Sequence, residues 1–290
     1  MLYHPLQKAE MKYFIFLLLC FKSGASFSQN LGTQRVNHVK NSIVKISIDG
    51  NPVGTGFIIS DKGQVLTCFH VIVSALSKNS QNQIFEQHTI EAEFISGEKV
   101  QIHLDSATDI EHSFFYDYCL LKPVSKPVFK YEYLKLGNFK NINEGDAVFT
   151  IGYPLGIQQP FISKGTLSTK FVDSTQLSAP NTKIKREAAW IDLTLNKGNS
   201  GGPIIKIGST TEQDQVIGIA TFILNPLNQK ADSLLNQIYQ YKNSGIEMHN
   251  TIGGVDFQLA SELVTLNAVY FSVGISGCIS IEHFKKKFKF

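Results

Sequence analysis

Short runs of β-branched and other apolar residues, separated by turn-forming residues, recur along most of this chain. Residues 42–48 alternate with period two, and residues 54–60 follow after Asp49-Gly50-Asn51-Pro52. The later runs occupy 90–104, 118–122, 146–152, 161–171, 187–194, 202–207, 215–223 and 278–282. Such runs are typical of antiparallel strands, and their number favours a sandwich or barrel over alternating strands and helices. Helical periodicity is found chiefly at 231–241 and 257–266, and a short helix is expected at the C-terminus.

A polar connection that contains prolines, at 122–146, divides the strands into two groups of similar size. With 290 residues, 43% of them hydrophobic, the chain is long enough to build a core in each group. The sequence therefore predicts an all-β chain of two packed antiparallel β-barrels, at 29–135 and 136–290. Loops from both barrels would then surround a shared cleft, which is a common position for an active site.

The charge balance gives little reason to expect a polyanionic partner. The chain has 27 basic and 24 acidic residues, a formal net charge of +3. Removing residues 1–28 leaves 24 basic and 23 acidic residues, so binding to nucleic acid is not expected. The one charge cluster consists of four lysines within 285–289, interleaved with phenylalanines. We interpret it as the solvated end of a helix, in preference to a membrane or nucleic-acid contact.

The N-terminus has the three-part pattern of a secretory signal peptide. A lysine precedes nine uncharged residues at 13–21, and the small residues that follow lead to a cleavage site before Gln29. Nine residues are too few to cross a bilayer, and no later run approaches the ~18 to 20 apolar residues of a membrane-spanning helix. We expect residues 1–28 to be removed, with Met11 as an alternative initiator, and the mature protein to be periplasmic or secreted. Lipid attachment at Cys20 is disfavoured because the residue before it is bulky.

Cysteine and histidine usage does not indicate a metal site. Cleavage would leave Cys68, Cys119 and Cys278, and an odd number cannot form a closed disulfide framework. The chain has no Cys-x-x-Cys pair, and its eight histidines lack the i, i+4 spacing of a zinc-binding helix. Two interpretations stay open: one disulfide between two of the three cysteines, or three cysteines buried as small apolar side chains. No metal or organic cofactor is expected.

Three widely separated segments carry residues suited to nucleophilic catalysis. In Asn196-Lys197-Gly198-Asn199-Ser200-Gly201-Gly202-Pro203, glycines flank a serine on backbone that can turn sharply and leave successive N–H groups unpaired. His70 ends an apolar strand, and Asp117 starts another. Each segment alone is more often a turn, a core histidine or a cap. Together they follow the order His, Asp, Ser, with separations of 47 and 83 residues, which makes coincidence a poor explanation.

These segments resemble the trypsin-like serine proteases, and within that superfamily the bacterial HtrA/Deg branch. The matching stretches are 54–59, 66–72, 117–122, 134–137, 144–146, 151–156, 164–168, 196–205, 216–221 and 274–281. They follow the family order from about residue 40 to residue 285, which is nearly the whole mature chain. The PDZ domain that follows in many HtrA relatives is not expected in this chain.

The resemblance implies a double β-barrel with a triad of His70, Asp117 and Ser200 in the cleft between the barrels. Ser200 would attack the scissile carbonyl, His70 would take and return its proton, and Asp117 would orient the imidazole. Asp105 and Asp109 are rivals for the acid role. Neither leads directly into an apolar strand, so we interpret both as loop residues.

Residues beside the expected triad depart from the family pattern. Phe69 stands next to His70, at a position where members of the family usually carry a smaller or polar residue. This difference predicts a narrower approach to the imidazole. The resemblance would also bring Cys68 and Cys119 close together, as a bridge or as a pair of thiols. Asn199 stands where digestive relatives have an aspartate, so activation by chain cleavage is not expected.

The residues around the nucleophile define the expected oxyanion hole and specificity pocket. The resemblance implies that the N–H groups of Gly198 and Ser200 hold the oxyanion. It also places the uncharged Thr194, six residues before the nucleophile, at the base of the primary pocket. The expected substrate-binding residues are Thr194, Ile219, Ala220 and Thr221. Such a pocket offers no carboxylate to a buried Lys or Arg, so we expect cleavage after small or medium aliphatic residues, with Asp192 as the nearby acid that could change this.

The segment at 224–272 is an insertion where the family pattern has a tight hairpin. It either pads the second barrel or forms a subunit contact in a homo-oligomer, and a lid over the site is a third interpretation. The expected function is that of an exported serine endopeptidase that acts on unfolded or damaged polypeptides. The alternative is a non-catalytic, protease-like module that binds peptides or regulates.

Overall fold

The computed structural model describes residues 31–81, 83–125, 130–176, 183–223, 251–252, 255–256 and 275–290. The expected signal peptide at 1–28 and the expected helices at 231–241 and 257–266 lie outside these residues. Within the insertion, the structure describes two short antiparallel strands, β14 (Thr251–Ile252) and β15 (Val255–Asp256). Among the described helices, none has the length and apolar character needed to cross a membrane.

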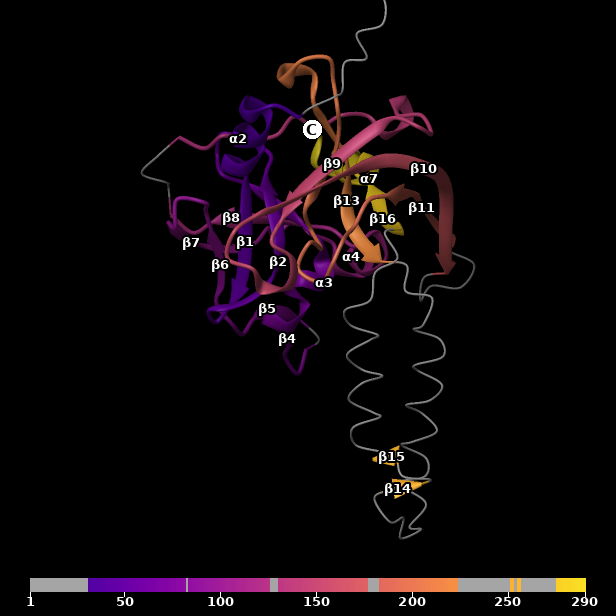
Figure 1. The fold of residues 1–290 in the computed structure, drawn as a ribbon. Coiled ribbons are helices and arrows are strands. Elements are labelled where there is room, and N and C mark those ends of the chain that lie inside the picture. The colour runs from indigo at the N-terminus through magenta and orange to yellow at the C-terminus, as the bar shows by residue number, and fades with distance from the viewer. Residues whose placement is uncertain are drawn as a thin grey trace, which may run out of the picture. The chain divides into compact units, whose positions relative to one another are not determined.

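The first barrel closes six strands in the order β1, β2, β3, β8, β7 and β6 (Figure 1). The strands are β1 (Ile43–Ile48), β2 (Asn51–Ile58), β3 (Val65–Thr67), β6 (Ile90–Glu93), β7 (Lys99–Leu104) and β8 (Cys119–Pro123). Asp49 and Gly50 join β1 to β2 in a two-residue turn with φ values of 48° and 79°. Both central residues of such a turn need positive φ, which matches the twist of the strands. Ile46, Phe57 and Leu120 are fully buried in the core of this barrel.

The second barrel closes six strands in the order β10, β11, β16, β13, β12 and β9. The strands are β9 (Ala147–Gly152), β10 (Phe161–Gln176), β11 (Lys183–Asp192), β12 (Pro203–Lys206), β13 (Gln215–Ile223) and β16 (Ile275–Ser280). Its core cluster includes Phe139, Ile191, Ile204 and Cys278. The prediction of two packed antiparallel β-barrels is confirmed.

The hairpin of β10 and β11 is longer than the sequence predicts. The apolar runs end at 171 and begin again at 187, whereas β10 continues to Gln176 and β11 begins at Lys183. β9 pairs with β10 from Phe161 to Thr166, and β16 pairs with β11 from Ala188 to Asp192. Residues 172–176 and 183–187 pair with each other beyond those flanking strands. We call this part of the hairpin the β10–β11 ribbon.

Short elements connect the strands. They are α2 (Thr33–Asn41), α3 (Phe69–Ile72), η1 (Val73–Ala75), β4 (Leu76–Lys78), β5 (Ile84–Glu86), α4 (Ile110–Tyr116), η2 (Phe139–Asn141), η3 (Pro154–Gly156), η4 (Thr211–Gln213) and α7 (Glu282–Phe288). The unit Asn37–Phe290 contains both barrels. α7 is the expected C-terminal helix: Phe284 is fully buried, and Lys285 Nζ donates a hydrogen bond to Gly137 O at 2.6 Å.

The two barrels are joined at Thr55 in β2. Thr55 N donates to Ser200 O at 2.9 Å, and Thr55 Oγ1 donates to Gly198 O at 2.7 Å. The same Oγ1 accepts from Tyr153 N at 3.0 Å. Because Thr55 is fully buried, these bonds are shielded from water. They hold the serine segment of the second barrel against the barrel that carries the expected histidine and aspartate.

Candidate active site

His70 lies in α3, the single helical turn that follows β3. The preceding Cys68 is still extended, with φ −72° and ψ 144°, so the helix begins at Phe69. Phe69 is 1% exposed and packs edge-to-face on Phe114 of α4, with ring centroids 4.9 Å apart. Phe69 thus anchors α3 in the interior and does not narrow the approach to the imidazole as the sequence predicted. The side chain of His70 is 46% exposed.

Asp117 is the residue that caps the C-terminus of α4. Its backbone is left-handed, with φ 46° and ψ 47°, and its N–H donates to Ser113 O. This conformation costs a non-glycine residue on the order of 1 kcal/mol, and aspartate is among the residues that tolerate it. Oδ1 of Asp117 accepts from His70 N at 3.0 Å, and Oδ2 lies 2.8 Å from His70 Nδ1. The carboxylate therefore binds both the backbone N–H and the ring of His70.

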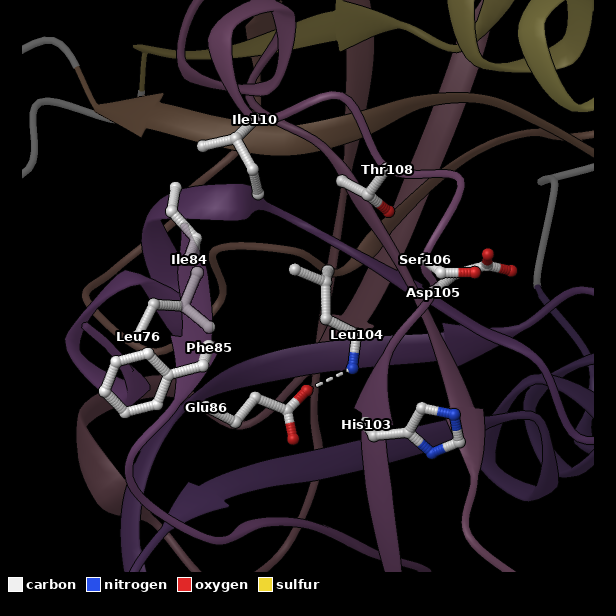
Figure 2. A pocket seen from close by; sticks show the side chains of 10 residues that line it. All are labelled: Leu76, Ile84, Phe85, Glu86, His103, Leu104, Asp105, Ser106, Thr108 and Ile110. Atoms are coloured by element: carbon white, nitrogen blue, oxygen red, sulfur yellow. Dashed lines mark hydrogen bonds between the residues drawn. The ribbon is translucent and has the colours of Figure 1, made fainter. Parts of the chain in front are cut away.

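The rival acids, Asp105 and Asp109, have other partners. Asp105 is 4% exposed and pairs with Lys122 at 2.6 Å. Asp105 lies at a cavity of about 380 Å³ that is lined by residues from β4, β5, β7 and the start of α4. Figure 2 shows its side chain among the lining residues. Asp109 caps the N-terminus of α4 by accepting from His112 N at 3.2 Å. The structure thus brings Asp117, and not its rivals, to His70.

Close approach of backbone explains the glycines around Ser200. Gly201 has φ +85°, and a Cβ there would lie 2.2 Å from Thr55 O. Gly198 has φ +100°, and a Cβ there would lie 2.4 Å from Tyr153 O. Side chains at either position would therefore push the serine segment away from its neighbours.

The peptide group between Lys197 and Gly198 has a defined orientation. Lys197 O accepts a hydrogen bond from Leu155 N at 2.6 Å. Because a trans peptide is planar, the N–H of Gly198 points away from that carbonyl and from Leu155. An N–H group oriented in this way is available to an oxygen that approaches from the other side.

A cavity of about 500 Å³ collects the expected histidine, serine and oxyanion residues. It is lined by Lys45, Pro52, Val53, Gly54, His70, Val71, Ser74, Tyr153, Leu155, Gly156, Lys197, Gly198 and Ser200. Residues 45–74 belong to the first barrel and residues 153–200 to the second, so the cavity lies where the two barrels meet. This is the position that the two-barrel arrangement predicts for a shared cleft.

Residues 54–219 match the family model of the trypsin-like peptidase domain. The match spans more than half of the chain and includes His70, Asp117 and Ser200. The chain belongs to the trypsin-like peptidase domain family. The resemblance to the trypsin-like proteases, inferred from the sequence motifs, is thereby confirmed.

Individual relatives place this trypsin-like peptidase domain near the HtrA-type proteins. A probable periplasmic serine endoprotease, DegP-like, from Rickettsia prowazekii is 28% identical over 176 residues, which cover 61% of this chain and 29% of the relative. Serine protease HTRA4 from Mus musculus is 29% identical over 168 residues, covering 58% of this chain and 29% of the relative. The match thus spans less than a third of the length of these relatives.

Solved structures support the fold. The HtrA-type protease AlgW with a tripeptide aligns with a TM-score of 0.53 at 18% sequence identity, covering 88% of this chain and 61% of that chain. The complex of the same protease with a decapeptide aligns with a TM-score of 0.51 at 16% identity, covering 88% of this chain and 66% of that chain.

The expected specificity residues of this trypsin-like peptidase domain lie apart from the cavity. Ile219 and Ala220 are fully buried in β13, where Ala220 belongs to the core of the second barrel. Thr194 is exposed, as is Asp192, and both follow the alternation expected of a strand. Thr221 is partly exposed, and its Oγ1 lies 3.5 Å from Cys68 Sγ.

Sequence reasoning missed several residues that line the cavity. Lys197, the start of β2 at 52–54 and the segment 153–156 form much of its wall. The available signals were local: Lys197 directly precedes Gly198, and residues 153–156 fall within a stretch that matches the family. Nothing in the sequence marked Lys45 as a site residue. It lies in β1, and its buried ammonium group pairs with Glu93 at 2.9 Å at the cavity.

The three described cysteines are free thiols, and all are fully buried. Cys68 Sγ donates to Ala220 O at 3.3 Å, and Cys119 Sγ donates to Cys68 O at 3.7 Å. Burial raises the pKa of both thiols well above the usual value, and it raises the pKa of Cys278 to about 12. The thiols therefore stay protonated at neutral pH, and the interpretation as small buried apolar side chains describes them better than a bridge.

Among the residues that the structure describes, one group of donor atoms has the spacing of a metal site. Ligand atoms of Cys68, His70 and Asp117 lie within 4.8 Å of one another. A metal would need the thiolate of Cys68, but burial raises the pKa of this thiol and keeps it protonated, and the thiol already donates to Ala220 O. Both carboxylate oxygens of Asp117 already bind His70. Hydrogen bonding accounts for the whole group without a metal.

Proposed function

We propose that this chain is a serine endopeptidase in which Ser200, His70 and Asp117 act as the catalytic triad. The observation that carries the proposal is the pair of bonds from Asp117 to His70 N and Nδ1. These bonds leave Nε2, on the opposite side of the ring, as the nitrogen that can serve Ser200 in the cavity that both residues line.

The chemistry follows from this arrangement. Ser200 Oγ attacks the scissile carbonyl carbon while His70 Nε2 accepts the hydroxyl proton. Asp117 keeps the ring in the required tautomer and stabilises the imidazolium that forms. The N–H groups of Gly198 and Ser200 receive the oxyanion, and each such donor contributes on the order of 3 kcal/mol to transition-state stabilisation. His70 then returns the proton to the leaving amine.

The substrates we propose are unfolded or damaged polypeptides outside the cytoplasm. The N-terminal pattern at 13–21 supports export, and the relatives named periplasmic endoproteases support the same compartment. We infer that the substrate enters as an extended strand, because an extended chain exposes its scissile carbonyl to both the serine and the oxyanion donors.

A fluorophosphonate probe tests the proposal directly. Folded wild-type protein should be labelled at Ser200, and Ser200→Ala should abolish both labelling and hydrolysis of an unfolded protein, with a rate loss on the scale of ~10⁶. Ser74→Ala is a matched control, because Ser74 lines the same cavity and its loss should leave labelling unchanged. Folded wild-type protein that stays unlabelled would support the peptide-binding alternative.

A further inference from the structure

The β10–β11 ribbon carries an arginine that is held by its neighbouring strand. Asp173 of β10 and Arg186 of β11 face each other in the strand register. Arg186 Nε and Nη2 lie 3.1 Å and 2.9 Å from Asp173 Oδ2. The side chain of Arg186 is only 20% exposed. The ion pair therefore fixes the direction of the guanidinium group and leaves Nη1 to bind elsewhere.

That remaining part of the guanidinium group reaches α4 in the first barrel. Arg186 Nη1 donates a hydrogen bond to Phe115 O, and the guanidinium carbon lies 4.9 Å from the centroid of the Phe115 ring. Phe115 is in the last turn of α4, where carbonyl groups have no partner within the helix. A cation at this end also interacts favourably with the helix dipole and the ring face. Arg186 is thus a cap supplied by the second barrel to a helix of the first.

The end of α4 is also where Asp117 lies. Asp117 follows Phe115 by two residues and leaves the helix in the left-handed conformation. Its carboxylate makes the two bonds to His70, of 3.0 Å and 2.8 Å. A shift in the last turn of α4 would change both distances, because the backbone of Asp117 moves with that turn.

We propose that Arg186 is a positioning residue for the His70–Asp117 pair, which it orients through Phe115 and the C-terminal turn of α4. The inference rests on the proposed function, and it assigns a role at the site to a residue of the β10–β11 ribbon that lies outside the triad. The β10–β11 ribbon is then coupled to the site, and any partner that displaces the ribbon lowers turnover.

The adjacent Lys185 gives a matched control. It lies next to Arg186 in β11, and its side chain is exposed. Lys185→Ala removes one positive charge from the same strand, as Arg186→Ala does, but leaves α4 untouched. A difference between the two variants therefore reports the contact with Phe115 and not the net charge.

The first experiment compares kcat and KM for hydrolysis of a labelled unfolded protein. Arg186→Ala should lower kcat by about 10- to 100-fold, since a misplacement of about 1 Å costs up to 10²-fold, and should change KM by less than about threefold. Arg186→Lys keeps the charge but can serve only one of the two acceptors, so its kcat should fall between those of the wild type and Arg186→Ala. Lys185→Ala should match the wild type.

A second readout does not depend on turnover. In a Ser200→Ala background, the far-downfield proton resonance of His70 Nδ1–H reports its hydrogen bond to Asp117. We expect Arg186→Ala to shift or broaden this resonance and Lys185→Ala to leave it unchanged. If Arg186→Ala does not fold, Asp173→Asn, which loosens the guanidinium group without removing it, is expected to give the same change in smaller measure.

The outcomes separate the two proposals. An Arg186→Ala protein with wild-type kcat and an unchanged resonance would overturn the positioning role, as would an equal loss in Lys185→Ala. Wild-type protein that neither labels nor hydrolyses would overturn the proposed function, while the resonance would still decide whether Arg186 orients the pair.

Discussion

Gly201→Ala tests how closely the two barrels approach at the candidate site. The new Cβ would lie 2.1 Å from Thr67 Oγ1 and 2.2 Å from Thr55 O, at a φ of +85°. Thr67 Oγ1 is buried and donates to Thr55 O at 2.7 Å, and Thr55 O belongs to the backbone of β2, so it must retreat by about 1 Å to reach an ordinary contact. Left-handed backbone costs ~1 to 2 kcal/mol and overpacking ~1 to 3 kcal/mol. We therefore expect Gly201→Ala to lower the free energy of unfolding by about 2 to 5 kcal/mol.

The control is Gly50→Ala. Gly50 has a similar φ of +79°, but a Cβ at this position would have no other atom within 4 Å. The free energy of unfolding of Gly50→Ala should therefore fall only by the cost of left-handed backbone, ~1 to 2 kcal/mol. Urea unfolding followed by tryptophan fluorescence gives both free energies of unfolding, and their difference measures the close approach alone.

Activity gives a second reading of the same variant. A displacement of about 1 Å in the serine segment should lower the rate of fluorophosphonate labelling of Gly201→Ala by up to about 10²-fold, measured at urea concentrations below the unfolding transition. Gly50→Ala should be labelled at the wild-type rate. If Gly201→Ala loses no more stability than Gly50→Ala and labels at the wild-type rate, the contact between the serine segment and β2 does not constrain the site, and the reasoning from close approach is refuted.

Three further predictions follow from single residues. Asp117→Asn keeps the shape of the side chain but favours the wrong tautomer, so turnover should fall by roughly 10⁴ while Asp105→Asn stays near wild type; the reverse result in steady-state assays would move the acid role to Asp105. Burial and repulsion from His112 lower the pKa of His283 to about 4, below the 6.5 of an unfolded histidine, so the folded state binds fewer protons between these values. The free energy of unfolding should therefore decrease as the pH falls from about 6.5 to 4, by ~1 to 2 kcal/mol for this partly exposed ring, and chemical denaturation of His283→Gln should lack that slope. Cleavage-site profiling in a denatured protein mixture should show small or medium aliphatic residues before the cut, as the resemblance implies, and a dominant Lys or Arg would contradict this expectation and point to the exposed Asp192.

Several features of the site could be predicted from the sequence because their chemistry is rare. A glycine-flanked serine, a histidine shortly after a strand and an aspartate shortly before another strand have few other uses in that order. The structure brings His70 and Asp117 into direct contact and places Ser200 in the same cavity as His70. The specificity residues stay a prediction: Ile219 and Ala220 point to opposite faces of β13 and both are fully buried, so the sequence pattern does not distinguish a pocket wall from the core.

Features that depend on neighbouring residues could be predicted from the sequence. Asp49 and Gly50 supply the positive φ values of a two-residue turn, and alternation of apolar residues defines most of the strands. The length of the β10–β11 ribbon, the free state of Cys68 and the left-handed backbone of Asp117 became apparent only in the folded chain. These features depend on groups that are distant in sequence, such as the carbonyl that Arg186 reaches across 71 residues, and local propensity carries no information about such partners.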